Sequence, residues 1–153
     1  MKNLKRLSIF VILLGGLFLF TGCTGGNVEG SLEDIMTKVY ADVEEKPMSL
    51  TNMEVNEENI EGFLGTKDID YTEALASEPQ VSSIAHSVVL VRTDGDVEAV
   101  KNKIKENVNP RKWWCVWVEP EDVIIKNKGN LIIVIIVEDE PTRTLIEKGF
   151  DAL

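Results

Sequence analysis

Two cysteines and one histidine are the residues of this chain whose side chains most readily act as nucleophile, base or zinc ligand near neutral pH. A zinc site needs more such ligands, and a catalytic cysteine needs a histidine base close by. We expect His86 to be a strand residue with a hydrogen-bonded ring, and Cys115, within an apolar run, to be a buried, unreactive thiol. The chain is therefore predicted to be no enzyme and to hold no metal or cofactor. An enzyme acting through carboxylates stays as an alternative.

Cys23 could carry out a different chemistry, the attachment of a lipid to its thiol. It follows the small residues Thr21 and Gly22 and an uncharged, mostly apolar run of 14 residues (7–20) after a basic start (2–6). This order is typical of a secretory signal peptide. As a helix, the run would span roughly 21 Å, less than the roughly 30 Å of bilayer hydrocarbon. We therefore expect cleavage before Cys23.

The stretch Phe20-Thr21-Gly22-Cys23 closely resembles the lipobox of bacterial lipoproteins, with Phe20 where leucine is most common. The resemblance implies a diacyl lipid on Cys23, and two acyl chains anchor a protein stably where one does not. Residues 1–22 are then the signal peptide, and residues 23–30 are the lipidated cysteine and a flexible, glycine-containing tether. Residues 31–153 form one domain, held to the cell membrane on its extracytoplasmic side.

The three tryptophans, Trp113, Trp114 and Trp117, are close enough in sequence to form one contact surface. In a strand, Trp113 and Trp117 would share one face and Trp114 would take the other, because side chains alternate. Exposed rings could stack on the sugars of a cell-wall polymer or anchor a protein partner. Buried rings would belong to the core on both sides of the sheet. Exposure decides between these alternatives.

Carboxylates gather in three short stretches, within residues 68–73, 119–122 and 138–140. None of them has the spacing, central glycine and final glutamate of a calcium-binding loop. Asp94-Gly95-Asp96 comes nearest and is interpreted as a helix start. We expect solvated turns at these places, with weak surface binding of calcium as the alternative.

The charge balance excludes one class of partner. Removal of residues 1–22 takes away three of the 16 basic residues and none of the 26 acidic ones, so the formal charge changes from −10 to −13. Nucleic acid and anionic lipid headgroups repel so acidic a body. We therefore predict no nucleic-acid binding.

Helical and strand patterns alternate along the mature chain. Helices are expected over residues 31–46, 57–64, 97–108 and 141–153, and strands over 69–78, 84–92, 113–118, 123–126 and 131–137. This order predicts an α+β domain of two layers, a mostly antiparallel sheet with helices packed on one face. The stretch 131–137 has no polar side, which is typical of a central strand covered on both faces. The second cover would be the first helix, a partner or another copy of the chain.

Four segments, His86–Arg92, the capped helix after it, Arg111–Val116 and Asn127–Ile132, resemble a domain-of-unknown-function family in order and spacing. Its members are small lipoproteins of Gram-positive bacteria, and the resemblance covers about residues 71–153 together with the lipobox. It implies a lipid-anchored α+β domain with no assigned activity or catalytic residues. It also associates the chain with membrane-bound O-acyltransferases that modify surface polymers.

These observations predict a non-enzymatic, lipid-anchored binding or accessory protein of the cell envelope. Its membrane contact would be the lipid on Cys23, and its partner another envelope protein or a surface polymer. A protein partner predicts an exposed apolar patch. The alternative is a cell-wall glycan-binding module that uses Trp113, Trp114 and Trp117.

Overall fold

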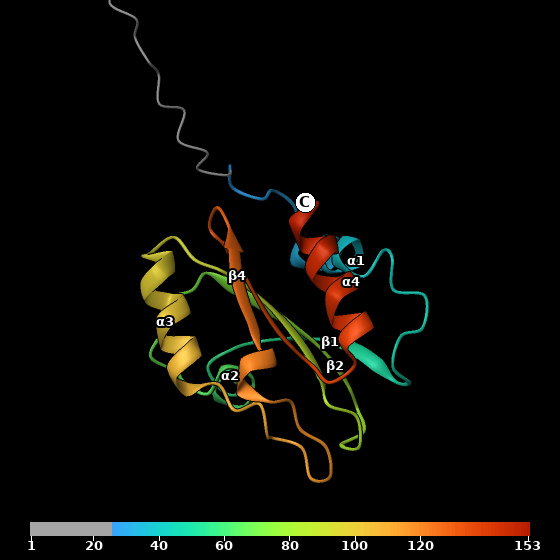
Figure 1. Ribbon diagram of the computed structural model, residues 1–153. Coiled ribbons are helices and arrows are strands. Elements are labelled where there is room, and N and C mark those ends of the chain that lie inside the picture. The colour runs from blue at the N-terminus through green and yellow to red at the C-terminus, as the bar shows by residue number, and fades with distance from the viewer. Residues whose placement is uncertain (1–25) are drawn as a thin grey trace, which may run out of the picture.

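The computed structural model describes residues 26–153, which form one five-stranded sheet and four α-helices (Figure 1). Every neighbouring pair of strands is antiparallel, and the strand order is β1-β2-β3-β5-β4. The strands are β1 (Leu50–Glu54), β2 (Glu73–Pro79), β3 (His86–Arg92), β4 (Ile124–Lys128) and β5 (Leu131–Val137). The helices are α1 (Leu32–Val39), α2 (Ile60–Leu64), α3 (Val97–Asn107) and α4 (Glu140–Asp151), with a 3-10 turn at Pro120–Asp122.

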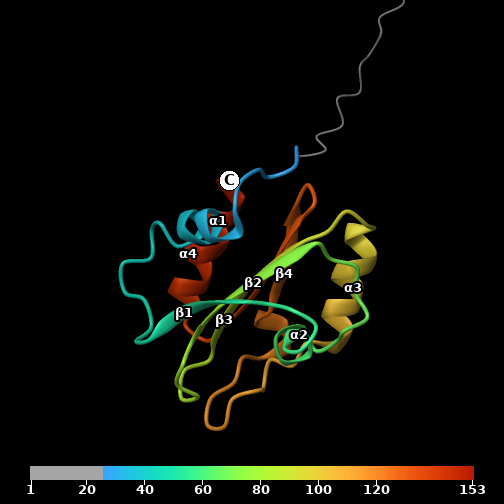
Figure 2. The ribbon, with the colours of Figure 1, turned by 180° about the vertical axis from the view of Figure 1, so that it is seen from behind.

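Helices cover both faces of the sheet. Figure 1 shows α1 and α4 on one side of the strands and α3 on the other, and Figure 2 shows the same arrangement from behind with α2 on the side of α3. The prediction of an α+β domain with an antiparallel sheet is confirmed. The prediction that the helices pack on one face only is wrong, and the domain has three layers.

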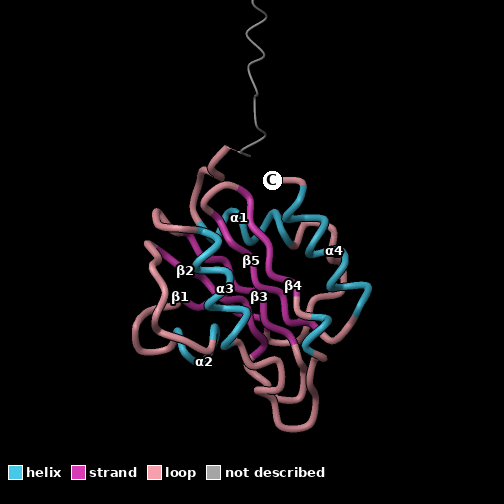
Figure 3. The backbone as a smooth tube through the Cα atoms, turned by 60° about the vertical axis from the view of Figure 1, so that its left-hand side comes forward, coloured by secondary structure: helices cyan, strands magenta, loops and turns pink. Residues whose placement is uncertain are grey.

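The physical reason for three layers lies in β5, whose seven residues are all buried. Alternate side chains of a strand point to opposite faces, so a strand without polar residues needs an apolar cover on each side. Leu131 and Ile133 lie in the core beneath α1 and α4, whereas Ile132 and Val134 lie in the core beneath α2 and α3. Figure 3 shows β5 in the middle of the sheet, between β3 and β4.

Side-chain caps begin three of the helices, two of them where the sequence predicts a helix start. The Ser31 hydroxyl accepts a hydrogen bond from the Asp34 amide (3.2 Å), and the Asp96 carboxylate accepts one from the Ala99 amide (3.1 Å). Asp139 caps α4 in the same way. Such caps satisfy amide groups that the first turn of a helix leaves unpaired.

Three segments differ from the sequence-based expectation. The first helix, expected over residues 31–46, ends at Val39. The strand predicted over residues 113–118 is a loop, and β1 is a strand that the sequence pattern did not indicate. The loop folds back on itself, because the Val118 amide donates a hydrogen bond to the Pro110 carbonyl oxygen (3.1 Å). In β1, Leu50 and Thr51 are half-buried and the last three residues are exposed, so this edge strand shows little apolar alternation.

The two ends of the sheet have different neighbours. The described N-terminal residues reach the domain at the turn between β4 and β5, where Gly129 lies against Gly26 and Asn27. We call this end of the sheet the tethered end. Residues 108–119, which we call the tryptophan loop, lie at the opposite end, which we call the far end (Figure 1).

Candidate functional site

The predicted lipid-attachment residue, Cys23, lies outside the described residues, as does the predicted cleavage point after residue 22. The described part of the predicted tether, residues 26–30, is held by the domain. Arg92 Nη2 donates hydrogen bonds to the carbonyl oxygens of Val28 (3.2 Å) and Gly30 (2.9 Å). The Val28 side chain packs against the core beneath α1 and α4. Residues 26–30 are therefore fixed to the domain and do not act as a flexible linker.

Membrane-spanning helices are not found between Gly26 and Leu153, since none of the helices there is both long and apolar enough.

The tryptophan loop is a compact excursion with tied ends. Besides the backbone bond between Val118 and Pro110, Arg111 forms an ion pair with Glu119 (2.8 Å). Val118 is buried in the core beneath α2 and α3, which fixes the end of the loop to the domain. Short loops of this kind, whose ends lie close together, frequently carry function.

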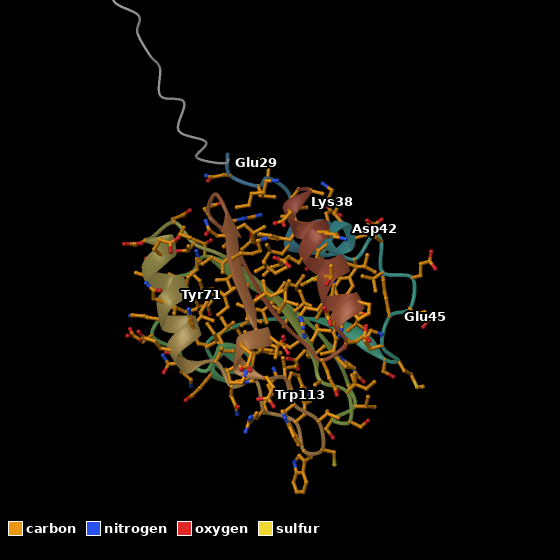
Figure 4. All side chains as sticks on the ribbon, in the orientation of Figure 1. Glu29, Lys38, Asp42, Glu45, Tyr71 and Trp113 are labelled. Carbon is orange, nitrogen blue, oxygen red and sulfur yellow. The ribbon has the colours of Figure 1, made fainter. Side chains whose placement is uncertain are left out.

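The three tryptophans differ in exposure. Trp114 is 92% exposed and Trp117 is 52% exposed, whereas Trp113 is half-buried against the core beneath α2 and α3. Core packing on both sides of a sheet, one of the two alternatives for these residues, is thus wrong for Trp114 and Trp117. Figure 4 shows Trp113 at the far end of the domain.

The Trp117 ring is held in place by two charged neighbours. Its indole Nε1 donates a hydrogen bond to Glu119 (3.0 Å), and the Arg111 guanidinium lies over the ring, 6.0 Å from its centroid. The hydrogen bond from Trp117, followed by the one from Arg111, holds the pKa of the Glu119 carboxyl below its ordinary value. Trp117 is therefore oriented before any partner binds.

Cys115 is exposed between the tryptophans. The expectation of a buried, unreactive thiol is wrong, because the apolar run that contains it is a loop at the surface instead of a strand in the core.

Lys112 forms a polar site that the sequence did not indicate. Its ammonium group forms an ion pair with Glu78 of β2, and both side chains are largely buried. The same ammonium nitrogen lies 3.4 Å from the Ser87 hydroxyl of β3 and 3.4 Å from the Gly62 carbonyl oxygen of α2. Segments distant in the chain thus converge on one positive charge.

Two aromatic rings complete the surroundings of this ammonium group. The Phe63 ring centroid and the Trp113 ring centroid each lie 5.1 Å from Lys112 Nζ, within the range of cation–π attraction. We call the whole set the ammonium cage; it consists of the Gly62 carbonyl, the Phe63 ring, the Glu78 carboxylate, the Ser87 hydroxyl and the Trp113 ring.

An open groove of about 750 Å³ adjoins the ammonium cage. It runs between α2 and the connection from β2 to β3, and Lys112 and Trp113 form part of its wall. Glu58 and Glu61 also line it. The groove is therefore acidic and partly aromatic, and it is continuous with the tryptophan loop.

His86 is buried in β3, where its Nε2 atom and the Tyr40 hydroxyl are hydrogen-bonded at 2.7 Å. Burial lowers the pKa of His86 to about 4 and raises the pKa of the Tyr40 phenol. The ring is consequently neutral at physiological pH. The prediction of a strand histidine with a hydrogen-bonded ring is confirmed.

The acidic stretches are occupied by structural contacts. Asp68 pairs with Lys103 (2.6 Å), Asp122 pairs with Arg143 (3.0 Å), and Asp139 caps α4. Within residues 26–153, no three histidine, cysteine or carboxylate side chains gather in a way that could hold a metal ion.

No protein-family model, no curated protein and no solved structure matches this chain. The resemblance to the family of small Gram-positive lipoproteins therefore stays a prediction.

Proposed function

We propose that this chain is a non-enzymatic, lipid-anchored binding or accessory protein on the extracytoplasmic side of a bacterial cell membrane. Cys23 carries the lipid, and the tryptophan loop contacts another envelope component. The observation that carries this proposal is the 92% exposure of Trp114 at the far end of the domain. A membrane O-acyltransferase complex that modifies surface polymers is a specific version of the partner.

The tether constrains how the domain is presented. Gly26 lies three positions after Cys23, with Thr24 and Gly25 between them, and an extended chain spans at most about 3.5 Å per residue. A lipid on Cys23 would thus place the tethered end within about 10 Å of the bilayer surface. The hydrogen bonds from Arg92 to Val28 and Gly30 keep residues 26–30 from adding to this distance.

The sheet then separates the tryptophan loop from the membrane. β5 runs from the turn at the tethered end to the far end over seven residues, and a strand rises about 3.3 Å per residue. The loop therefore lies up to about 20 Å farther from the bilayer than the tether, and it reaches this height when the strand stands upright on the membrane. This arrangement favours a partner in the space beyond the membrane surface over the lipid itself.

An exposed tryptophan is useful to a partner that can cover it. Trp side chains bury about 150–250 Å² each, and removal of this mostly apolar area from water favours association. Tryptophan is also among the residues that dominate binding energy at protein interfaces. Trp114 is already exposed in the free protein, so no conformational change is needed before a partner covers its ring.

The test is recovery of the intact protein with its partner. The tagged full chain is expressed, membranes are solubilised in mild detergent, and the co-purifying proteins are identified and quantified. We expect one stoichiometric envelope protein with the wild type and its loss with Trp114→Ala, while Met48→Ala, a control at another exposed apolar residue that does not line the groove beside Lys112, retains it. Equal recovery with wild type and Trp114→Ala would count against the proposal.

The second candidate is a cell-wall glycan-binding module. The observation that favours it is the half-exposed Trp117 ring, which is oriented by Glu119 and Arg111 as a platform for a sugar ring would be. Sedimentation with purified, protein-free cell wall distinguishes the two candidates. Wall binding that Trp117→Ala abolishes would favour the glycan module, and absence of wall binding would favour the protein partner.

The location has its own test. Cys23→Ala removes the thiol that would carry the lipid, so the protein should be released from the membrane or remain at its uncleaved size. Membrane retention of a mature-sized Cys23→Ala protein would contradict lipid anchoring.

A further inference from the structure

We propose that the ammonium cage is a binding site for a lysine side chain of a partner protein, and that Lys112 occupies this site until the partner displaces it. The proposal rests on the proposed function for the existence of that partner. It specifies the side chain that the partner must present. It also gives the tryptophan loop two states, one with Lys112 in the cage and one with Lys112 displaced from it.

The cage has the composition of a site for an ammonium ion. Two aromatic faces at 5.1 Å attract the positive charge, the Glu78 carboxylate neutralises it, and two oxygens at 3.4 Å can accept its hydrogen atoms. Aromatic cages recognise cationic ligands in this way. Four of the five groups come from α2, β2 and β3, so most of the site exists independently of the loop.

Lys112 is the point at which the loop can be released. Among the described residues, it makes the side-chain hydrogen bonds that connect the tryptophan loop to groups outside residues 108–119. The hydrogen bonds of Arg111 and Trp117 end on Glu119, within the loop. A second ammonium group that enters the cage would therefore remove the polar connection of the loop to the body of the domain.

Exchange of one lysine for another is energetically feasible where simple removal of Lys112 is not. Removal would leave the largely buried Glu78 carboxylate without its counter-ion, which is strongly destabilising for a buried pair. An incoming lysine replaces the charge, the cation–π contact with Phe63 and the hydrogen bonds, which all belong to groups outside the loop. The difference in free energy then comes from the new contacts that the partner makes with the released loop.

The groove beside the cage is lined by carboxylates that attract a cationic segment of a partner. Glu58 lines the groove and forms no ion pair with any residue from Gly26 onward. Glu61 forms an exposed pair with Lys67 at 3.8 Å, which is worth little. The mature chain carries a formal charge of −13, so a basic segment is attracted to the domain as a whole. A lysine-bearing protein segment fits both the groove and the cage.

The experiment uses n-butylammonium chloride, which reproduces the four-carbon stem and the ammonium group of lysine. The full chain in mild detergent carries Lys112→Ala, which empties the cage. We expect butylammonium at about 100 mM to raise the Tm of this variant by about 3 °C or more above the effect of equimolar sodium chloride. We expect 1-butanol, which lacks the charge, to have no such effect.

A matched variant identifies the site. Glu78→Gln combined with Lys112→Ala should weaken butylammonium binding at least tenfold, because the carboxylate that neutralises the ammonium is gone. Glucosamine, whose amine is attached directly to a sugar ring, should not act. Stabilisation that survives Glu78→Gln, or that glucosamine produces and butylammonium does not, would overturn the proposal.

The wild type gives a measurement that does not depend on the folding of any variant. A tethered lysine competes at an effective concentration in the millimolar range, so butylammonium well above that range should displace it. We expect a change in the NMR signal of the Trp113 indole that sodium chloride does not cause. An unchanged Trp113 signal would overturn the proposal, whereas normal partner binding by Trp114→Ala would overturn the proposed function and leave the cage result standing.

Discussion

Gly149 of α4 lies directly against the backbone of Val39 in α1. A Cβ atom on Gly149 would lie 2.3 Å from the Val39 carbonyl oxygen, far inside an ordinary van der Waals contact. Glycine at this position therefore allows the two helices to approach closely on their face of the sheet. The two helices cover this face of the sheet together only when they lie this close, since Val39 of α1 and Phe150 of α4 are buried in the same core.

Gly149→Ala should consequently destabilise the domain. Alanine is favoured over glycine inside a helix by about 1 kcal/mol, but a methyl group that meets backbone cannot be relieved by rotating a side chain. We expect a net loss of about 1–3 kcal/mol in the free energy of unfolding, measured by urea titration. Gly62→Ala in α2 is the matched control, because nothing lies within 4 Å of its Cβ position. Equal stability of the two variants would contradict the close contact.

Strong local signals predicted most of the fold. The apolar runs of β3 and β5 and the helix starts at Ser31 and Asp96 depend on residues close together in sequence, and the structure confirms them. The wholly apolar stretch that forms β5 indicated that both faces of the sheet are covered. It did not indicate whether the first helix, a partner or a second copy covers the second face, because that depends on the path of the whole chain.

The tryptophan loop and the ammonium cage show what sequence could not supply. The stretch 113–118 has strand-like composition, yet the tied ends at Pro110 and Val118 and the place of β4 beside β5 keep it out of the sheet. Lys112 and Glu78 meet only because β2 and the end of α3 reach the same end of the sheet. No spacing rule connects residues that the topology brings together over such separations.

The buried His86 should make the stability of the domain depend on pH. Its pKa is about 4 in the folded chain and about 6.5 when the chain is unfolded, so protonation favours unfolding. The contribution of the neutral ring is fully present above pH 6.5 and is lost as the pH falls from 6.5 to 4. We expect a loss of about 3 kcal/mol over this window, measured as the free energy of unfolding in urea at a series of pH values.

His86→Gln is the control for this effect. The glutamine amide can still form a hydrogen bond with the Tyr40 hydroxyl, but it does not titrate. Glu138 and Asp139 line the same cavity as His86. Hydrogen bonds with Thr142 lower the pKa of Asp139, so protonation of Asp139 affects the stability of the domain only below about pH 4. A pH dependence between 6.5 and 4 that is unchanged in His86→Gln would show that His86 is not its source.

The exposed Cys115 should react in the folded protein. Its thiol lies at the surface of the tryptophan loop, so a thiol-specific reagent does not need to wait for the domain to open. We expect the rate of modification by a disulfide reagent at pH 8 to lie within about tenfold of the rate in denaturant. The lipidated Cys23 would not compete for the reagent. Modification only after unfolding would restore the buried thiol that the sequence predicted.

Arg92 should control how firmly the tether is bound. Arg92→Met keeps the apolar stem and removes the donors to Val28 and Gly30, and hydrogen bonds to charged groups contribute about 1.5–3 kcal/mol each. Because a protease needs a freed segment, cleavage after Glu29 by a glutamate-specific protease should accelerate tenfold or more. Glu73→Gln, which loses its ion pair with Arg92 and leaves both carbonyl contacts in place, should be cleaved at nearly the wild-type rate. An unchanged rate in Arg92→Met would mean that the packing of Val28 holds the tether, and the orientation argued for the tryptophan loop would then rest on that contact alone.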